Sequence, residues 1–291
     1  MIPLRAWWQL CRVPNLFTAA ADIGAGYLFT GGDTTHWQTP ALLMIAAMCL
    51  YAGGVVLNDV YDADRDAMTR RDRPIPSGQV SRRHAACVGA TLLVAGWALA
   101  AAAGGRAALT AGLLAFCILV YDGWAKQTRV APAVMGLCRA LNLMLGMVDA
   151  PAWPADEHLF AAAMMWLYVS SVTLFARREA EFAGMTHIRI GWIGAAAGVA
   201  GLGGLPCFMD AYEPVGRVMV GTLLLTVVLV GRPAARAGSP HDVQRAVTVY
   251  VLAIIAFDAC LACTARGLMP AGVILTLLIP AVLLARAIRV T

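Results

Sequence analysis

Apolar residues occur along this chain in long runs separated by short polar segments, rather than in alternation with polar residues. A helix needs about 20 mostly apolar residues to cross the hydrocarbon layer of a membrane, whereas a transmembrane strand needs short alternating segments. The pattern therefore predicts an all-α fold, a polytopic transmembrane helical bundle. The expected spans are 13–30, 40–58, 84–103, 107–121, 131–149, 158–175, 190–208, 214–231, 246–265 and 268–287.

The last two expected spans are separated by only a few residues, so they predict either two helices or a hairpin that does not cross fully. Nine or ten helices are therefore expected. The apolar runs cover most of the 291 residues and leave no room for an appended soluble domain. We accordingly expect one transmembrane domain over residues 1–291.

Composition supports the membrane assignment. The chain is 60% hydrophobic and only 13% charged, whereas a soluble domain has about a quarter of its residues charged. The net charge of +5 does not indicate nucleic acid, because the basic residues lie in short segments between the apolar runs.

The distribution of those basic residues predicts an orientation. With the N-terminus in the cytoplasm, the outside loops hold only Arg106, Arg217 and Arg266, while most other Lys and Arg residues fall inside. Cytoplasmic loops of membrane proteins carry such an excess. We therefore expect an integral protein of the cytoplasmic (inner) membrane, with both termini cytoplasmic if there are ten helices.

A dense group of acidic residues follows the second span. If the helix continues through it, Asp59, Asp62 and Asp66 lie at i, i+3 and i+7, on one helical face spanning about 10 Å, and Asn58 can join that face. Neighbouring carboxylates repel one another and resist burial near a bilayer. Mg²⁺ removes that cost, since it binds one or two carboxylates together with water and phosphate oxygens.

Two other interpretations of this segment remain open. The acids could form an ordinary solvated loop, paired with the nearby Arg65, Arg70, Arg71 and Arg73. They could also line an ion path in an ion-coupled transporter, as intramembrane carboxylates often do, although no pair of similar halves is visible in the sequence.

The order of these residues resembles the UbiA superfamily of intramembrane prenyltransferases. The pattern N-D-x-x-D-x-x-x-D at 58–66 is followed by R-P-I-P-S-G at 73–78. Arg12 and Asn15 resemble the polar entry of the family's first helix, and Tyr121 and Lys126 resemble the tyrosine and lysine that end its fourth. The likeness extends over about residues 10–210.

The resemblance implies a bundle around a lipid-open central cavity, with two acidic motifs that hold Mg²⁺ and the diphosphate of an isoprenyl donor. The implied reaction transfers the prenyl group to an unidentified small-molecule or lipid acceptor. An intramembrane terpene cyclase on the same scaffold is the alternative. The expected catalytic residues are Asp59, Asp62, Asp66 and Lys126, and the expected substrate-binding residues are Arg12, Asn15, Asn58, Arg70, Arg73 and Tyr121.

The second acidic motif departs from the family pattern. The family has aspartates after the sixth helix, whereas this chain has Arg177, Arg178, Glu179 and Glu181. The two glutamates are expected as further metal ligands, although they would not share one helical face, and an ordinary charged helix end is the other interpretation. The Glu-x-Glu pattern and the stretch C-R-A-L-N-L-x-L-G at 138–146 look most like the EboC-like branch.

Arg139 and Asn142 lie one helical turn apart within an apolar run. An intramembrane arginine is costly, so it usually faces a cavity or a charged partner. Either both residues line the cavity and face the diphosphate, or they form a structural pair with Asp22, Asp149 or Asp258.

Overall fold

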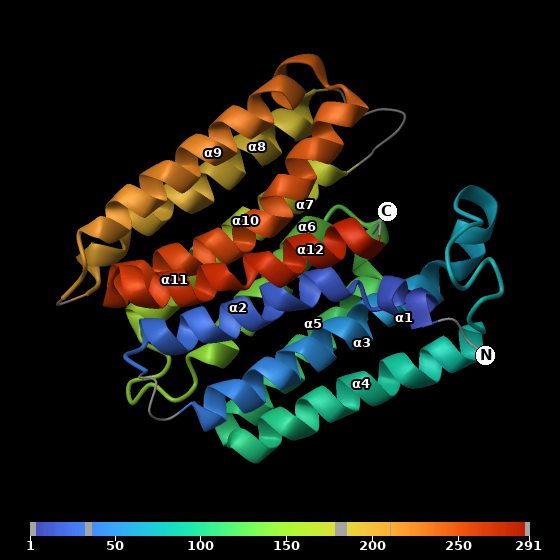
Figure 1. The fold of residues 1–291 in the computed structure, drawn as a ribbon, viewed down its shortest axis with the longest axis horizontal. Helices are drawn as coiled ribbons and strands as arrows, with labels where there is room; N and C mark the ends of the chain where they lie inside the picture. Colours follow the sequence, from blue (N-terminus) through green and yellow to red (C-terminus); the bar gives the residue numbers. More distant parts are fainter. Residues whose placement is uncertain (1–3, 33–36, 178–184, 210, 289–291) are drawn as a thin grey trace.

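The computed structural model describes residues 4–32, 37–177, 185–209 and 211–288, and all regular structure within those ranges is helical (Figure 1). Eight helical segments are long and apolar enough to cross a membrane, among them α11 and α12 taken together. The helices are α1 (Leu4–Leu10), α2 (Val13–Phe29), α3 (Gln38–Thr69), α4 (Arg82–Ala103), α5 (Gly105–Gly123), α6 (Ala131–Gly146), α7 (Asp156–Ala176), α8 (Thr186–Gly201), α9 (Val215–Ala237), α10 (Pro240–Arg266), α11 (Leu268–Thr276) and α12 (Leu278–Ile288). Two 3₁₀ helices, η1 (Ala125–Gln127) and η2 (Leu202–Cys207), follow α5 and α8.

Each of the ten expected spans falls on helical structure, and the all-helical prediction is confirmed. The helices α2 and α6, of 17 and 16 residues, are shorter than the eight long segments. The last expected span is divided between α11 and α12, with the break at Leu277. Pro280 explains the break, because its ring lacks an N–H and collides with the carbonyl four residues earlier.

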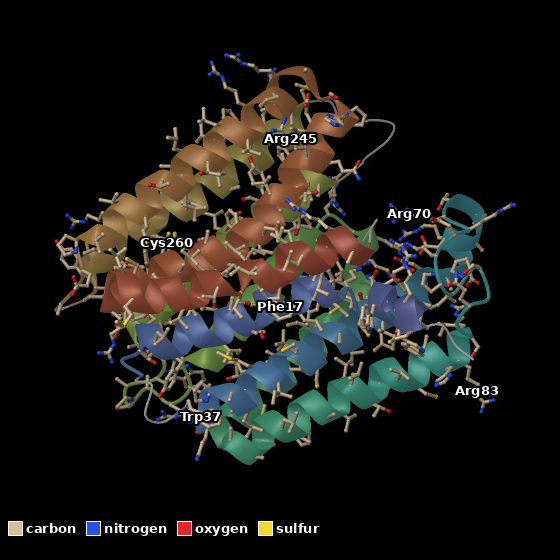
Figure 2. The ribbon with its side chains drawn as sticks, in the orientation of Figure 1. Phe17, Trp37, Arg70, Arg83, Arg245 and Cys260 are labelled. Carbon is tan, nitrogen blue, oxygen red and sulfur yellow. The ribbon has the colours of Figure 1, made fainter. Side chains whose placement is uncertain are left out.

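The main difference from expectation lies in α3, which continues eleven residues beyond the predicted end of its span at residue 58 to end at Thr69. Its last three turns carry the acidic motif. Figure 2 shows the two ends of this helix, with Trp37 at one end of the bundle and Arg70, among many polar side chains, at the other. The continuation makes the acidic motif helical rather than a loop.

The helix α2 lies at the centre of the bundle, where it packs against α3, α6, α10 and α12 (Figure 1). One apolar core joins α7, α8, α9 and α10, and a second joins α2, α3, α4 and α5. Both cores include residues of α2 and α6, so these two helices connect the two groups of helices.

Small residues let α2 and α6 approach to backbone contact. A Cβ atom built on Gly26 would lie 2.6 Å from the carbonyl oxygen of Leu143, and one built on Gly146 would collide with the carbonyl of Ile23. Such small-residue contacts are typical of helix packing in membranes, where no hydrophobic driving force exists between helices. The close approach brings the polar side chains of α2 and α6 within bonding distance.

Candidate active site

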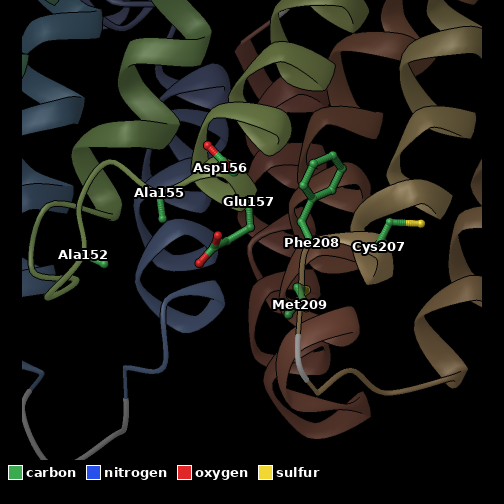
Figure 3. A pocket seen from close by; sticks show the side chains of 7 residues that line it. All are labelled: Ala152, Ala155, Asp156, Glu157, Cys207, Phe208 and Met209. Carbon is green, nitrogen blue, oxygen red and sulfur yellow. The ribbon is translucent and has the colours of Figure 1, made fainter.

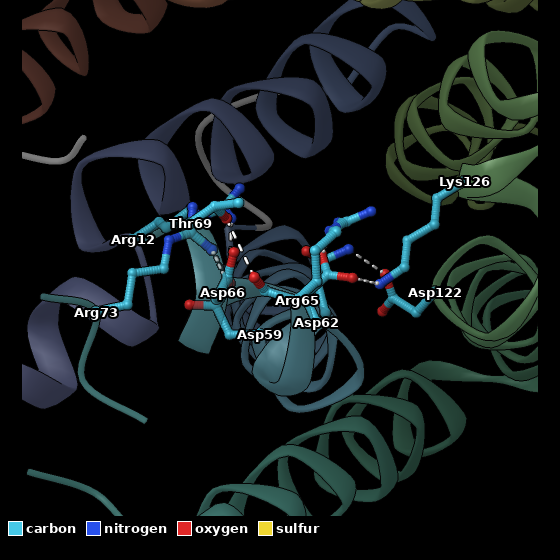
Figure 4. Close-up of polar contacts among 10 residues, drawn as sticks. Arg12, Asp59, Asp62, Arg65, Asp66, Thr69, Arg73, Asp122 and Lys126 are labelled. Atoms are coloured by element: carbon cyan, nitrogen blue, oxygen red, sulfur yellow. Dashed lines mark hydrogen bonds and ion pairs between the residues drawn. The ribbon is translucent and has the colours of Figure 1, made fainter. Parts of the chain in front are cut away.

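The three predicted aspartates form one buried row on α3. Asp59, Asp62 and Asp66 retain 7%, 8% and 4% of their accessible surface, whereas Asp64 on the opposite face is exposed. The spacing i, i+3, i+7 produces this arrangement because the helix continues through the motif. Figure 4 shows the three side chains directed toward the same polar region. The predicted common face is confirmed, and the solvated-loop interpretation does not describe this segment.

Arg73, in the loop after α3, forms ion pairs with two of these carboxylates. Its Nη1 lies 3.0 Å from Asp59 Oδ1 and 2.9 Å from Asp66 Oδ2. Arg12 approaches Asp59 Oδ1 from the other side at 3.4 Å. Two guanidinium groups from distant parts of the chain therefore converge on the first aspartate of the row.

The loop conformation that places Arg73 comes from local hydrogen bonds. The Arg73 N–H donates to the Arg70 carbonyl, the Ser77 N–H to the Arg73 carbonyl, and the Val80 N–H to the Pro74 carbonyl. Gly78 has φ of +76°, a backbone conformation that glycine adopts without steric cost. The R-P-I-P-S-G sequence thus forms a compact turn that folds back over the end of α3.

Asp62 is held by cations from two other directions. Lys126 Nζ lies 2.6 Å from Asp62 Oδ1, and Arg65 Nη2 lies 2.8 Å from Asp62 Oδ2. The lysine side chain is only 8% exposed, and its ammonium also lies 5.6 Å from the centroid of the Tyr61 ring. The structure therefore places η1 against α3. Lys126, which follows Asp62 by 64 positions in the chain, faces the acidic row.

Arg12 occupies an unusual backbone conformation. It connects α1 to α2 with φ of +45°, and among the described residues it is the one non-glycine residue with positive φ. This region is costly for residues with a Cβ atom and persists where surrounding structure requires it. The strained junction turns the Arg12 side chain toward Asp59.

Two adjoining cavities meet at this point, and Arg12 and Asn58 line both. A polar cavity of about 230 Å³ is also lined by Asp62, Asp66, Arg70 and Arg73, among others. An apolar cavity of about 370 Å³ continues into the bundle between α2, α3, α5, α6, α7 and α10. The predicted residues that line the apolar cavity are Arg12, Asn15, Asn58, Tyr121, Arg139 and Asn142.

Arg139 and Asn142 both line the apolar cavity and both bind Asp22 of α2. Arg139 Nε lies 3.0 Å from Asp22 Oδ2, and Asn142 Nδ2 donates to the same oxygen at 2.7 Å and to the Ala19 carbonyl at 3.0 Å. Asp22 and the neighbouring Asp258 are completely buried. The pairing with Asp22 that the sequence left open is therefore present, at a position that still faces the cavity.

The structure adds one acidic residue that the sequence analysis did not single out. Asp122, in the last turn of α5, is 4% exposed and lines the apolar cavity. Its Oδ1 accepts a hydrogen bond of 2.7 Å from Asn58 Nδ2. One indication in the sequence that Asp122 belongs to the site was its place between Tyr121 and Lys126. Spacing alone could not show which way its carboxyl group points.

Glu179 and Glu181 lie outside the described residues, as does Arg178, so their predicted role stays a prediction. Arg177, at the end of α7, donates to the Thr128 carbonyl and thereby connects α7 to the segment before α6.

The residues of the acidic row fit Mg²⁺ in chemical type. Three buried carboxylates on one face supply oxygen ligands, and Mg²⁺ needs only one or two of them when phosphate and water complete its shell. Within the described part of the chain, no three acidic, histidine or cysteine side chains form a preformed metal-binding group. The arrangement therefore fits a cation shared with a bound diphosphate rather than one enclosed by protein alone.

A wider pocket of about 620 Å³ lies at the start of α7 and is lined by Asp156, Glu157, Cys207 and Phe208, among others (Figure 3). The two acids are in the first turn of α7, where negative charge stabilises the positive end of the helix dipole. Their position is explained by the helix, and the pocket has none of the predicted site residues.

Comparison with curated proteins finds relatives that match part of the chain in sequence. Over 146 residues the chain is 32% identical to digeranylgeranylglyceryl phosphate synthase of Methanothrix thermoacetophila, a match covering 50% of this chain and 55% of the relative. Over 172 residues it is 30% identical to protoheme IX farnesyltransferase of a Synechococcus species, covering 56% of this chain and 51% of the relative. The chain thus matches about half the length of these curated relatives.

Solved structures share the fold over nearly their whole length. A structure of digeranylgeranylglyceryl phosphate synthase superposes with a TM-score of 0.69 at 17% identity, covering 91% of this chain and 99% of that one. A UbiA homologue from Archaeoglobus fulgidus, bound to GPP and Mg²⁺, superposes with a TM-score of 0.62 at 13% identity, covering 89% of this chain and 100% of that one.

The sequence profile of the UbiA prenyltransferase family matches residues 19–291. This range includes the acidic row, the compact turn formed by R-P-I-P-S-G and all of the cavity-forming helices after α2. The resemblance to this family is confirmed, and the EboC-like branch stays a prediction. The protein is an integral membrane protein, and this chain belongs to the UbiA prenyltransferase family.

Proposed function

We propose that this protein transfers a prenyl group from an isoprenyl diphosphate to an acceptor within the membrane, in a reaction that requires Mg²⁺. The observation that carries the proposal is the junction of a charged cavity with an apolar one at Arg12 and Asn58. A prenyl diphosphate likewise has a charged part and an apolar part, since its diphosphate head is joined to a hydrocarbon chain.

The charged cavity offers cations for the diphosphate. Arg12, Arg70 and Arg73 line it, and Lys126 reaches the acidic row from η1. Arg12, Arg73 and Lys126 pair with Asp59, Asp62 and Asp66, which keeps the buried carboxylates compensated. Binding of a diphosphate gives the arginines and the lysine a second anionic partner, so charge accumulating on the leaving group is stabilised.

Asp59, Asp62 and Asp66 are the residues that would hold Mg²⁺, and bound Mg²⁺ would neutralise charge on the diphosphate oxygens. The allylic C–O bond breaks, and pyrophosphate leaves with the bonding electron pair. The apolar cavity receives the carbocation-like prenyl group and keeps water away from it. The acceptor forms the new bond to the allylic carbon and loses one proton.

The family relatives suggest the donor class. The Archaeoglobus fulgidus homologue was solved with GPP and with DMAPP, both isoprenyl diphosphates, together with Mg²⁺. Several relatives are named digeranylgeranylglyceryl phosphate synthase and one protoheme IX farnesyltransferase, so acceptors differ widely within the family. We therefore propose the donor by class and leave the acceptor as a small molecule or lipid of the membrane.

We also propose that residues 1–291 form one catalytic domain in the cytoplasmic membrane, with both termini on the cytoplasmic side. The excess of Lys and Arg at the end of the bundle that carries Arg70 supports this orientation. The same end carries the charged cavity, so a water-soluble short-chain donor would enter from the cytoplasm.

The test is release of pyrophosphate from geranyl diphosphate by native membranes that contain the protein, because these membranes also contain the acceptor. We expect release with Mg²⁺, none with EDTA, and recovery when Mg²⁺ is restored. Asp62→Asn should abolish release, whereas Asp64→Asn, on the exposed face of α3, should not change it. Normal release by Asp62→Asn would contradict the proposal.

Mass spectrometry of the lipid extract then separates the possible reactions. A prenylated adduct supports transfer, and a cyclised hydrocarbon or alcohol would instead indicate a terpene cyclase. If pyrophosphate is not released under any of these conditions, the transporter interpretation of the acidic row gains support.

A further inference from the structure

Asp122 differs from the other carboxylates at the polar end of the cavity in its lack of a cationic partner. Asp59 and Asp66 pair with Arg73, and Asp62 pairs with Lys126 and Arg65. In the part of the chain that the structure describes, Asp122 makes no ion pair within 4.0 Å and accepts one hydrogen bond, from the neutral amide of Asn58.

The second oxygen of Asp122 is buried and has no hydrogen-bond donor among the described residues. The residue is 96% buried and lies at the boundary between the charged and the apolar cavity, beside Asn58 and Tyr121. A buried carboxylate with an unsatisfied oxygen is costly, and it is found where a cation or a proton completes its surroundings.

The position of Asp122 relative to the acidic row favours a cation. Its hydrogen-bond partner Asn58 directly precedes Asp59 on α3. Lys126, four residues further along the chain in η1, pairs with Asp62, and its side chain is directed toward the same region as Asp122 (Figure 4). Asp122 therefore brings a carboxylate from α5 to a site whose other described carboxylates all come from α3.

We infer that Asp122 is an additional ligand of the divalent cation, binding it from the α5 side together with Asp62 of α3. This inference rests on the proposed function, because it concerns the cation that holds the diphosphate. Two carboxylates from different helices, completed by diphosphate and water oxygens, match the ligand set that Mg²⁺ prefers. With a cation bound to Asp62, Lys126 would be available to pair with the diphosphate.

The assignment also accounts for a feature of the sequence. The chain has glutamates instead of aspartates after α7, so its second acidic motif departs from the family pattern. A carboxylate at position 122 supplies a further hard oxygen ligand from α5, a helix other than α3.

The experiment measures cation binding directly, by electron paramagnetic resonance of Mn²⁺ titrated into protein that is saturated with geranyl diphosphate. Asp122→Asn is the informative variant, because the asparagine oxygen can still accept the hydrogen bond from Asn58 Nδ2. We expect at least tenfold weaker Mn²⁺ binding by Asp122→Asn, partial recovery by Asp122→Glu, and unchanged binding by Asp64→Asn. Asp122→Ser serves as a second neutral variant if Asp122→Asn does not give folded protein.

The outcomes separate this inference from the proposed function. If Asp62→Asn weakens Mn²⁺ binding and Asp122→Asn does not, the cation site stands and the role of Asp122 is wrong. If Asp122→Asn binds Mn²⁺ normally but no longer transfers the prenyl group, Asp122 is a proton acceptor instead of a ligand. If neither variant changes Mn²⁺ binding, the acidic row is not the cation site and the proposed function itself fails.

Discussion

Lys126 Nζ lies 2.6 Å from Asp62 Oδ1, so the 3₁₀ turn after α5 is joined to the buried acidic row of α3 by an ion pair. The lysine side chain is almost enclosed, and its aliphatic part fills space between the two helices. The ion pair therefore holds the ammonium beside Asp62, which lines the charged cavity.

Replacing this lysine should reduce the rate of the chemical step. We expect Lys126→Met to lower kcat for pyrophosphate release about a hundredfold, because a buried positive charge facing the leaving group is lost. Steady-state kinetics with geranyl diphosphate measures the effect. Arg129→Gln removes a positive charge from an exposed position nearby and should leave kcat unchanged. Equal effects of the two substitutions would contradict a specific role for Lys126.

Arg73 provides a second, separable prediction. It bridges Asp59 and Asp66 and lines the charged cavity, so Arg73→Gln should weaken donor binding. Hydrogen bonds to charged groups contribute about 1.5–3 kcal/mol, which corresponds to about a ten- to hundredfold increase in KM. Arg82→Gln is the matched control, because Arg82 pairs with the exposed Asp64. A KM that does not change in Arg73→Gln would argue against diphosphate binding at this residue.

The pair of Arg139 and Asp22 should contribute to stability. Both side chains are at least 90% buried, and the pair joins α6 to α2. Arg139→Leu leaves the Asp22 carboxylate without its cation, which costs about 3–5 kcal/mol when a buried pair is broken from one side. Unfolding in detergent titrated with SDS measures the loss.

A double variant tests whether the effect arises from the unpaired charge. Asp22→Asn combined with Arg139→Leu removes both charges, so it should recover a large part of the stability that Arg139→Leu alone loses. A double variant as unstable as the sum of its single substitutions would show that the two side chains act independently.

The glycine contact between α2 and α6 predicts the effect of added volume. Gly146→Ala places a methyl group against the backbone of Ile23, which cannot move aside as a side chain can. We expect destabilisation of about 1–3 kcal/mol, as for other overpacked sites, again measured by SDS unfolding. Gly221→Ala, in the middle of α9 where no atom lies within 4 Å of the added Cβ, should not destabilise the protein.

The acidic row shows how far spacing alone could predict the site. Three aspartates at i, i+3 and i+7 share a face in any helix, so their convergence followed from the sequence once the helix was assumed. The length of α3 was underestimated because its last turns are charged, and hydropathy marks only the part of a helix that matches the apolar layer. Helix continuation beyond that layer depends on packing and ion pairs, such as those of Arg73 and Lys126.

Asp122 shows where prediction from spacing ends. Its neighbours Tyr121 and Lys126 were identified by resemblance, yet the sequence gives no indication that its carboxyl accepts a hydrogen bond from Asn58, 64 positions away. The same holds for Arg139, for which three aspartates were equally suitable partners until α2 and α6 were seen in contact.

By itself, the sequence determined the membrane-spanning helical class, the buried face of the acidic motif and the family resemblance. The first depends on hydropathy, the second on helical periodicity within one segment, and the third on the order of the motif residues along the chain. Only the tertiary structure decided which cation compensates each carboxylate, and that a charged cavity and an apolar one share Arg12 and Asn58 in their walls. The physical reason is that electrostatic pairing depends on distances between helices, and those are set by side-chain volumes and close backbone contacts, such as the contact of Gly146 with Ile23, that no local pattern encodes.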